Sequence, residues 1–119
     1  MEAPESNKQA LRFNQGKLAY SLVHWASMAI MIQVLMFGAK KYAPDNWKNG
    51  MNRKKILESL QRHVSALFDG ETVDPESGLN HIGHVMCNAM FYSYYVLHPE
   101  LETKYEPSNL KKAYDIYNS

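Results

Sequence analysis

The sequence predicts an all-α fold, a compact bundle of three main helices followed by a short C-terminal helix. Three long segments carry apolar residues at helical spacing, and a glycine or proline follows each of them. No stretch alternates apolar and polar residues as a strand would, and no repeat is present. A length of 119 residues indicates one domain. We therefore expect a loose polar arm at residues 1–15 and a single helical domain at residues 16–119.

The first helix is expected over about residues 18–37, and no charged residue lies between Leu18 and Ala39. A helix that is apolar on all sides is usually buried, either at the centre of a fold or in an oligomer interface. Gly38 is expected to end the helix, because glycine accepts the left-handed conformation found after helices. The sequence thus predicts this helix as the element on which the others pack.

The same segment is long enough to cross a bilayer, so a membrane span has to be weighed. Polar residues interrupt it at His24, Ser27 and Gln33, and lysines flank it on both sides. The other helices also carry apolar faces that need a central element to pack on. We therefore expect no membrane partner.

Three further helices follow from local signals. Asn52 can cap a second helix over about residues 53–68, which Gly70 stops. A third helix is expected over about residues 79–97, closed by Pro99. A short amphipathic helix near the C-terminus carries Leu110, Ala113 and Tyr117. Turn residues fill the first connection, residues 40–52, and carboxylates fill the second, residues 69–78.

Charge and cysteine content exclude several classes of function. The formal net charge of +1 disfavours a duplex-DNA binder, although it permits a local basic pocket for one nucleotide. The single cysteine, Cys87, forms no internal disulfide and fits a reducing cytoplasm, and we expect a structural thiol. No signal-peptide pattern is present. A metal site would have to use His, Asp and Glu, which favours magnesium, manganese or zinc.

One face of the third helix carries His81, His84 and Asn88, spaced three and seven residues apart. Side chains at this spacing can converge on one point, where two histidines can share a metal ion or contact phosphate. The alternative is a set of half-buried polar residues that hydrogen-bond at a seam between helices.

The loop before this helix supplies four carboxylates. Glu71 and Asp74 are the preferred metal ligands, because carboxylates beside neutral imidazoles suit a divalent cation. Asp69 and Glu76 are expected to be solvated. Favourable interaction with the helix dipole is the alternative explanation for one or two of them.

On the second helix, His63 borders the apolar face and can turn inward to meet the third helix. Arg62 projects further round, where its planar guanidinium could hold a phosphate. The alternative for Arg62 is a surface ion pair with Glu58, four residues earlier, which would contribute little.

The first connection mixes cations with aromatic rings. Lysines can bind a triphosphate, and a Trp or Tyr face can stack on a base. The candidate nucleotide-binding residues are Lys40, Lys41, Tyr42, Asn46 and Trp47, with Lys17 as a further phosphate candidate. The alternative is that Tyr42 and Trp47 cover the end of the apolar helix.

Two strings carry a resemblance to a known family: FGAKKYAPDNWKNGM at residues 37–51 and LQRHVSALFDGETVDPESGLNHIGHVMCNAMF at residues 60–91. The chain resembles the phage family of dATP/dGTP diphosphohydrolase N-terminal domains, which includes the MazZ proteins, over most of residues 12–97. The resemblance implies a MazG-like all-α fold, divalent metal, a dimer or tetramer, and the host cytoplasm.

The resemblance also implies roles for the candidate residues. Mg²⁺ or Mn²⁺ held by His63, Glu71, Asp74, His81 and His84 would activate water, with Glu71, Asp74 and His84 as catalytic residues. The nucleotide would be bound by Lys17, Lys40, Lys41, Tyr42, Asn46, Trp47, Arg62 and Asn88. MazG-like enzymes carry E-x-x-E and E-x-x-D pairs on successive helices. This chain has His81-x-x-His84 and Arg62-His63 instead, so either histidines rebuild the metal site or metal catalysis is absent.

The function that follows is a phage nucleotide pyrophosphohydrolase. It would convert dGTP or dATP to the monophosphate and pyrophosphate. The alternative is a non-catalytic phage protein that sequesters a signalling nucleotide, and a third option is a helical module without a ligand. In the first two cases the partner is a nucleotide, not a nucleic acid polymer, and we expect a homo-oligomer.

Overall fold

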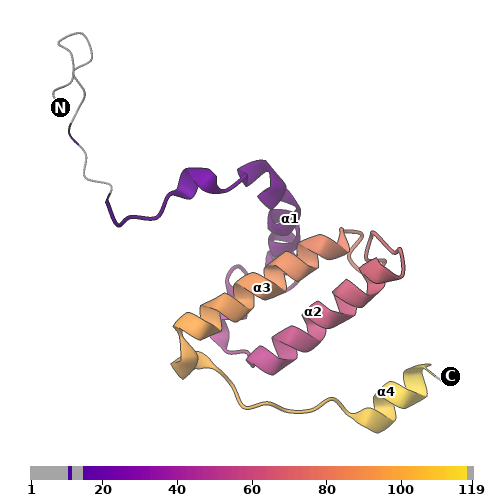
Figure 1. Cartoon of the computed structure of the whole chain (residues 1–119). Coiled ribbons are helices and arrows are strands. Elements are labelled where there is room, and N and C mark those ends of the chain that lie inside the picture. The colour runs from indigo at the N-terminus through magenta and orange to yellow at the C-terminus, as the bar shows by residue number, and fades with distance from the viewer. Residues whose placement is uncertain (1–10, 12–14, 118–119) are drawn as a thin grey trace.

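The computed structural model describes residue 11 and residues 15–117 (Figure 1). It contains four α-helices: α1 (Trp25–Lys41), α2 (Arg53–Phe68), α3 (His81–Leu97) and α4 (Leu110–Tyr117). Three short 3-10 turns accompany them: η2 (Tyr20–Leu22), η3 (Asn46–Asn49) and η4 (Pro99–Leu101). Within the described residues there is no strand beyond one isolated bridge, Val73 to Asn80. The predicted all-α class is confirmed, and most of the predicted N-terminal arm lies outside the described residues.

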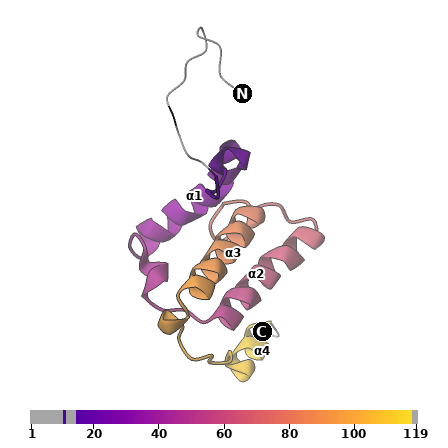
Figure 2. The ribbon, with the colours of Figure 1, turned by 60° about the vertical axis from the view of Figure 1, so that its left-hand side comes forward.

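The centre of the fold is the antiparallel pair α2 and α3, which lie side by side in both views (Figures 1 and 2). The predicted cap of α2 is confirmed, because the Asn52 side-chain oxygen accepts a hydrogen bond from the Lys54 backbone N–H at 2.9 Å. This bond satisfies one of the amides that every helix leaves unpaired at its first turn. Ile56 of α2 and Tyr95 of α3 are fully buried between the elements.

Helix α1 lies on one side of α3 and is displaced from its predicted limits. It begins at Trp25, seven residues later than expected, because residues 20–22 form η2. The prediction that Gly38 ends the helix is wrong, since Gly38 keeps a helical backbone and the helix runs on to Lys41. Pro44 and the left-handed Asp45 (φ 59°) turn the chain instead.

The expected central position of this apolar helix is also wrong for the single chain. Val34 is its one buried residue among those described, whereas Met36 is 65% exposed. The physical reason is that α2 and α3 pack directly on each other, which leaves α3 as the main neighbour of α1 within the described residues. Contact with α3 is close: a Cβ added at Gly83 would lie 2.6 Å from the Ile30 carbonyl oxygen.

Cys87 behaves as the expected structural thiol. It is buried at the contact with α1, and its Sγ donates to the Met31 carbonyl oxygen at 3.3 Å. Burial raises the pKa of Cys87 to about 12, so the thiol stays protonated and unreactive.

After α3 the chain crosses back along α2. Glu102 receives hydrogen bonds from the backbone and guanidinium of Arg53, and the Tyr105 hydroxyl donates to Glu58 at 2.6 Å. The segment ends in α4, as expected near the C-terminus. No helix in the described part of the chain is both long and apolar enough for a membrane crossing.

Candidate functional site

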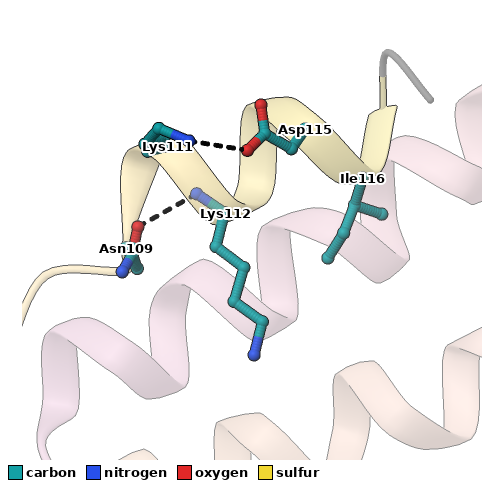
Figure 3. Close-up of a pocket in the computed structure, with 5 residues that line it drawn as sticks. All are labelled: Asn109, Lys111, Lys112, Asp115 and Ile116. Carbon is teal, nitrogen blue, oxygen red and sulfur yellow. Dashed lines mark hydrogen bonds and ion pairs between the residues drawn. The ribbon is translucent and has the colours of Figure 1, made fainter.

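Two cavities stand out in the described part of the chain, and both are open to solvent. The smaller, about 390 Å³, lies on α4, where Lys111 and Asp115 already pair with each other at 3.2 Å (Figure 3). The larger, about 1160 Å³, is bounded by α1, the connection after it, α2, the acidic loop and α3. It gathers ten of the thirteen candidate residues: Lys41, Tyr42, Asn46, Trp47, Arg62, His63, Asp74, His81, His84 and Asn88. The larger cavity is therefore the candidate site.

Three candidates do not line this cavity. Lys17 and Lys40 are exposed elsewhere on the chain, so the structure does not bring them to the other candidates. Glu71 lies behind the cavity wall and acts on it through His81.

A hydrogen-bonded chain joins Glu71, His81 and His63. The Nε2 atom of buried His81 lies 2.7 Å from a Glu71 carboxylate oxygen, and its Nδ1 lies 2.8 Å from Nδ1 of His63. A carboxylate can only accept, so His81 Nε2–H donates to it. When both rings are neutral, His81 Nδ1 then accepts from His63 Nδ1–H. Nε2 of His63 is left as an acceptor nitrogen in a ring that lines the cavity.

A second chain joins His84, Ser77 and Asp74. The Ser77 hydroxyl donates to Asp74 Oδ2 at 2.8 Å, and it lies 2.7 Å from Nε2 of His84. Since the single hydroxyl proton is given to Asp74, Ser77 accepts from His84 Nε2–H. Nδ1 of neutral His84 is thereby left as a second acceptor nitrogen.

The two chains meet where the rings of His63 and His84 stack, with centroids 4.4 Å apart and planes within 5°. Burial lowers the pKa of His63, and the neighbouring His84 and His81 lower it further. Burial also lowers the pKa of His84, against the opposing effect of Asp74. Both rings are therefore held neutral near pH 7, since a charged ring would be poorly solvated there.

Asp74 remains a carboxylate beside these rings. Burial alone would raise the pKa of Asp74, but hydrogen bonds from the Ser77 hydroxyl and from two backbone amides outweigh it and leave the pKa lowered. Asp74 also caps its own loop, because the Ser77 backbone N–H lies 3.1 Å from Oδ2. The loop conformation and the charge of the site are thus fixed by the same contacts.

Asn88 completes the buried polar cluster. Its Nδ2 donates to the His84 carbonyl oxygen at 2.9 Å and to the Ser59 hydroxyl at 3.3 Å. The first bond lies within α3, and the second joins α3 to α2. Asn88 therefore supports the α2–α3 contact beside the stacked rings of His63 and His84, as well as lining the cavity.

The predicted metal site consists of His63, Glu71, Asp74, His81 and His84. Among the described residues, no group of three or more His, Cys, Asp or Glu side chains is placed to hold one metal ion. The ring nitrogens of His63 and His81 point at each other, and Glu71 faces the far side of His81. These side chains do not fit a metal ion as they lie, so the metal site stays a prediction.

The connection after α1 forms the opposite wall. Trp47 reaches the cavity, but its ring is already stacked on Phe91 at 4.8 Å and meets Tyr94 edge-on at 5.0 Å. Tyr42 lines the cavity, and this residue is 66% exposed. Of the two, Tyr42 is the aromatic ring with surface left for a ligand.

Cations lie around the rim. Arg62 lines the cavity, and Glu58, the alternative partner considered for it, instead accepts from Tyr105. Lys41 forms an exposed ion pair with Glu76 at 3.6 Å, which reaches from the end of α1 to the acidic loop. Exposed pairs of this kind are worth little, so Lys41 is easily recruited by a more strongly charged ligand.

Two site residues were missed in the sequence. Ser77 links Asp74 to His84, and Ser59 supports Asn88 from α2. Asp74 forms an Asx-type turn with the Glu76 backbone N–H, two residues on, and this local turn signal could have drawn attention to the neighbouring Ser77. No local signal marks Ser59, because its role depends on the pairing of two helices.

Comparison with known proteins agrees with the resemblance. Residues 7–105 match the family described as dATP/dGTP diphosphohydrolase, N-terminal. A protein of Salmonella phage PMBT28 named dATP/dGTP diphosphohydrolase is 33% identical over 81 residues, which are 68% of this chain and 28% of that relative. The matched segment thus spans less than a third of the relative's length, and no solved structure gives a significant match. The chain belongs to the dATP/dGTP diphosphohydrolase N-terminal family.

Proposed function

We propose that this domain binds a purine deoxynucleoside triphosphate, dGTP or dATP, and hydrolyses it to the monophosphate and pyrophosphate. The observation that carries the proposal is the Glu71–His81–His63 hydrogen-bonded chain, which ends in the cavity wall. The name of the phage relative supports the choice of substrate.

The cavity suits a nucleotide in size and in lining. Its volume of about 1160 Å³ exceeds the roughly 300–1,000 Å³ usual for small-molecule pockets, so a triphosphate has room. Arg62 and Lys41 supply positive charge for the phosphates, and the exposed ring of Tyr42 offers a face for the base. Trp47 is assigned the back of this wall, because Phe91 covers part of its ring.

The chemistry follows from the direction of the hydrogen bonds. A water molecule attacks a phosphorus of the α–β anhydride bond, and its proton passes to Nε2 of His63. The anhydride bond breaks, giving the monophosphate and pyrophosphate. The Glu71 carboxylate stabilises the positive charge that His63 acquires, acting through His81. Glu71 and His81 are therefore positioning residues.

In this proposal, Mg²⁺ or Mn²⁺ would enter the site bound to the phosphates of the substrate. Magnesium is commonly held by one or two carboxylates together with substrate phosphates, where it neutralises their charge. Asp74 is the carboxylate that lines the cavity close to the histidines. This role requires one carboxylate, not the five-residue site predicted from the sequence.

The decisive experiment is product analysis by anion-exchange chromatography. The purified chain is incubated with each common NTP and dNTP, with Mg²⁺, Mn²⁺ or EDTA. We expect metal-dependent monophosphate and pyrophosphate from dGTP or dATP. His63→Gln should lower kcat by roughly 10²–10⁴-fold, the usual contribution of a general base. His98→Gln is the matched control, since this histidine caps the far end of α3 and lies outside the cavity.

A second candidate function is nucleotide sequestration without turnover. The mutual bonding of the candidate ligands favours it, since these side chains are satisfied without a metal ion. Calorimetry separates the two functions: tight nucleotide binding that EDTA leaves unchanged, with no product formed by any substrate, would replace the enzyme with a binding protein.

A further inference from the structure

The contact between α2 and α3 holds a polar pair that the proposed chemistry does not use, Ser59 of α2 and Asn88 of α3. Asn88 is 8% exposed, Ser59 is half-buried, and both residues line the larger cavity. A hydrogen bond of 3.3 Å from Asn88 Nδ2 to Ser59 Oγ joins the two side chains. Buried polar groups are usually satisfied by protein, by water or by a ligand, so each remaining donor and acceptor of the pair needs a partner.

The amide oxygen of Asn88 is one of these remaining groups. A carbonyl oxygen can only accept, so the amide nitrogen of Asn88 must face the His84 carbonyl, at 2.9 Å. No residue in the described part of the chain donates to Asn88 Oδ1. Among the described residues, no unpartnered side-chain oxygen or nitrogen is fully enclosed by protein. Oδ1 is therefore an acceptor that solvent or a ligand can reach from the cavity that Asn88 lines.

Ser59 adds a donor beside this acceptor. Its oxygen accepts from Asn88, and its own hydroxyl proton has no acceptor within the described residues. A phosphate oxygen carries no proton at neutral pH, so it would leave Asn88 Oδ1 without a partner. A hydroxyl group donates and accepts, and it can satisfy both atoms at once. The pair therefore suits an uncharged hydroxyl better than a phosphate.

The position of the pair along α3 indicates which hydroxyl it meets. His84, Asn88 and Phe91 follow one another at intervals of four and three residues on one face of α3, and all three line the cavity. Along the helix axis these intervals are about 6 Å and about 4.5 Å. Asn88 thus lies between the stacked histidines and the contact of Phe91 with Trp47. A nucleotide has its groups in the same order, with the sugar between the phosphates and the base.

We propose that Asn88 and Ser59 are specificity-determining residues that bind the 3′-hydroxyl of a purine deoxynucleotide. Asn88 Oδ1 accepts the hydroxyl proton, and the Ser59 hydroxyl donates to the sugar oxygen. The deoxyribose then lies against α2 and α3, with the α-phosphate at His63 and the base towards the wall that carries Tyr42 and Trp47. This inference rests on the proposed function, because it takes a purine nucleotide as the ligand, and it holds for binding with or without turnover.

Calorimetry with paired nucleotides tests the assignment on the full chain. The dissociation constants of dGTP and dATP are each compared with that of the 2′,3′-dideoxy form, with Ca²⁺ in place of Mg²⁺ to slow turnover. We expect the wild type to bind the dideoxy form on the order of tenfold more weakly than its parent, because Asn88 Oδ1 and the Ser59 hydroxyl lose their partner.

Two variants and a matched control locate this discrimination. In Asn88→Leu the ratio of the two dissociation constants should fall to about one, because the interaction is removed from both sides of the comparison. Ser59→Ala should also lower the ratio, and it carries the test if Asn88→Leu loses its helices by circular dichroism. Ser65→Ala is the control, since Ser65 is exposed on α2 and does not line the cavity, and the wild-type ratio should persist.

A purely structural role for Asn88 would weaken the binding of parent and dideoxy forms alike and leave the ratio unchanged, which overturns the proposal. Equal binding of the two forms by the wild type also overturns it. A loss of affinity for dITP, which lacks the amino group of both purine bases, that disappears in Asn88→Leu would assign the pair to the base instead of the sugar. A wild type that binds neither dGTP nor dATP overturns the proposed function together with this inference.

Discussion

The α2–α3 pair and helix α1 differ in a way that their sequences do not suggest. Helix α2 is amphipathic and α3 carries two histidines and an asparagine, yet these helices hold the buried residues Ile56, His81 and Tyr95. Helix α1 has no charged residue before Lys40 and buries a single side chain among those described, Val34. Polar groups can be buried where each finds a partner, and an apolar helix stays exposed where the described part of the chain packs against one side of it.

Gly83→Ala should produce the largest effect, because it disturbs the closest approach between α1 and α3. The new Cβ would lie 2.6 Å from the Ile30 carbonyl oxygen and 3.0 Å from Cγ2 of Val34. A backbone atom cannot yield as a flexible side chain can, so α1 must move off α3. We expect a loss of about 3 kcal/mol in the free energy of unfolding, at the upper end of overpacking costs.

Urea unfolding followed by circular dichroism measures this change. An unchanged midpoint would mean that α1 adjusts freely against α3 and adds little to the stability of the pair. In that case the close approach at Gly83 would not hold α1 against the α2–α3 pair.

Tyr95→Phe should produce the next effect, within the α2–α3 region and its loop. The fully buried hydroxyl donates to the Trp47 carbonyl oxygen at 2.6 Å and accepts from the Gly50 backbone N–H at 3.0 Å. Its removal leaves both backbone groups without this partner. We expect a loss of about 2 kcal/mol.

Hydrogen exchange shows which backbone amides Tyr95→Phe affects, which a measurement of overall stability does not. Faster exchange should be confined to residues 42–51, the cavity wall that the hydroxyl anchors. Tyr92→Phe, on the same helix, is the control and should leave that exchange unchanged. Equal exchange in the Tyr95 variant and the wild type would show that the wall is held by other contacts.

The same contrast explains what the sequence could and could not predict. The start of α2 at Arg53 followed from Asn52, because a cap is a local interaction between neighbouring residues. The convergence of His63, His81 and His84 was foreseen from helical spacing, and the structure brings them together. The predicted position of α1 was wrong, because an apolar surface indicates that a helix packs against another element but does not identify that element. Hydrogen-bond directions in the histidine chain also required the packed structure.

Acidification should weaken the packing of His63 against His84 before it weakens the apolar contacts of the fold. The pKa values of His63 and His84 are lowered from 6.5, so below pH 6.5 the unfolded chain binds protons that the folded chain does not. Stability is therefore complete above pH 6.5 and falls as the pH drops from 6.5 towards the lowered values. His84, His81 and Arg62 oppose a positive charge on His63, whereas Asp74 favours it. A positive charge on His84 is favoured by Asp74 and Glu76 and opposed by His81.

Unfolding midpoints at pH 7.5 and pH 5.5 test this dependence. We expect a lower midpoint at pH 5.5 in the wild type and a smaller difference in the His63→Gln/His84→Gln variant. The acidic carboxylate Asp74 titrates below its ordinary 3.8 and so does not contribute in this window. A wild-type midpoint that stays constant between the two pH values would show that the rings accept protons without cost.

Gly38→Ala should produce the smallest effect and the opposite sign. Gly38 has a helical backbone within α1, and an added Cβ would have no other atom within 4 Å. Alanine then gains helix propensity and restricts the unfolded chain, so we expect stabilisation of about 0.5–1 kcal/mol. The measurement is the same urea unfolding used for Gly83→Ala. Destabilisation would restore the sequence-based expectation that the helix ends at Gly38. A gain in stability would support a helix α1 that continues to Lys41. The opposite effects of alanine at Gly38 and at Gly83 would then come from packing, because both glycines have a helical backbone.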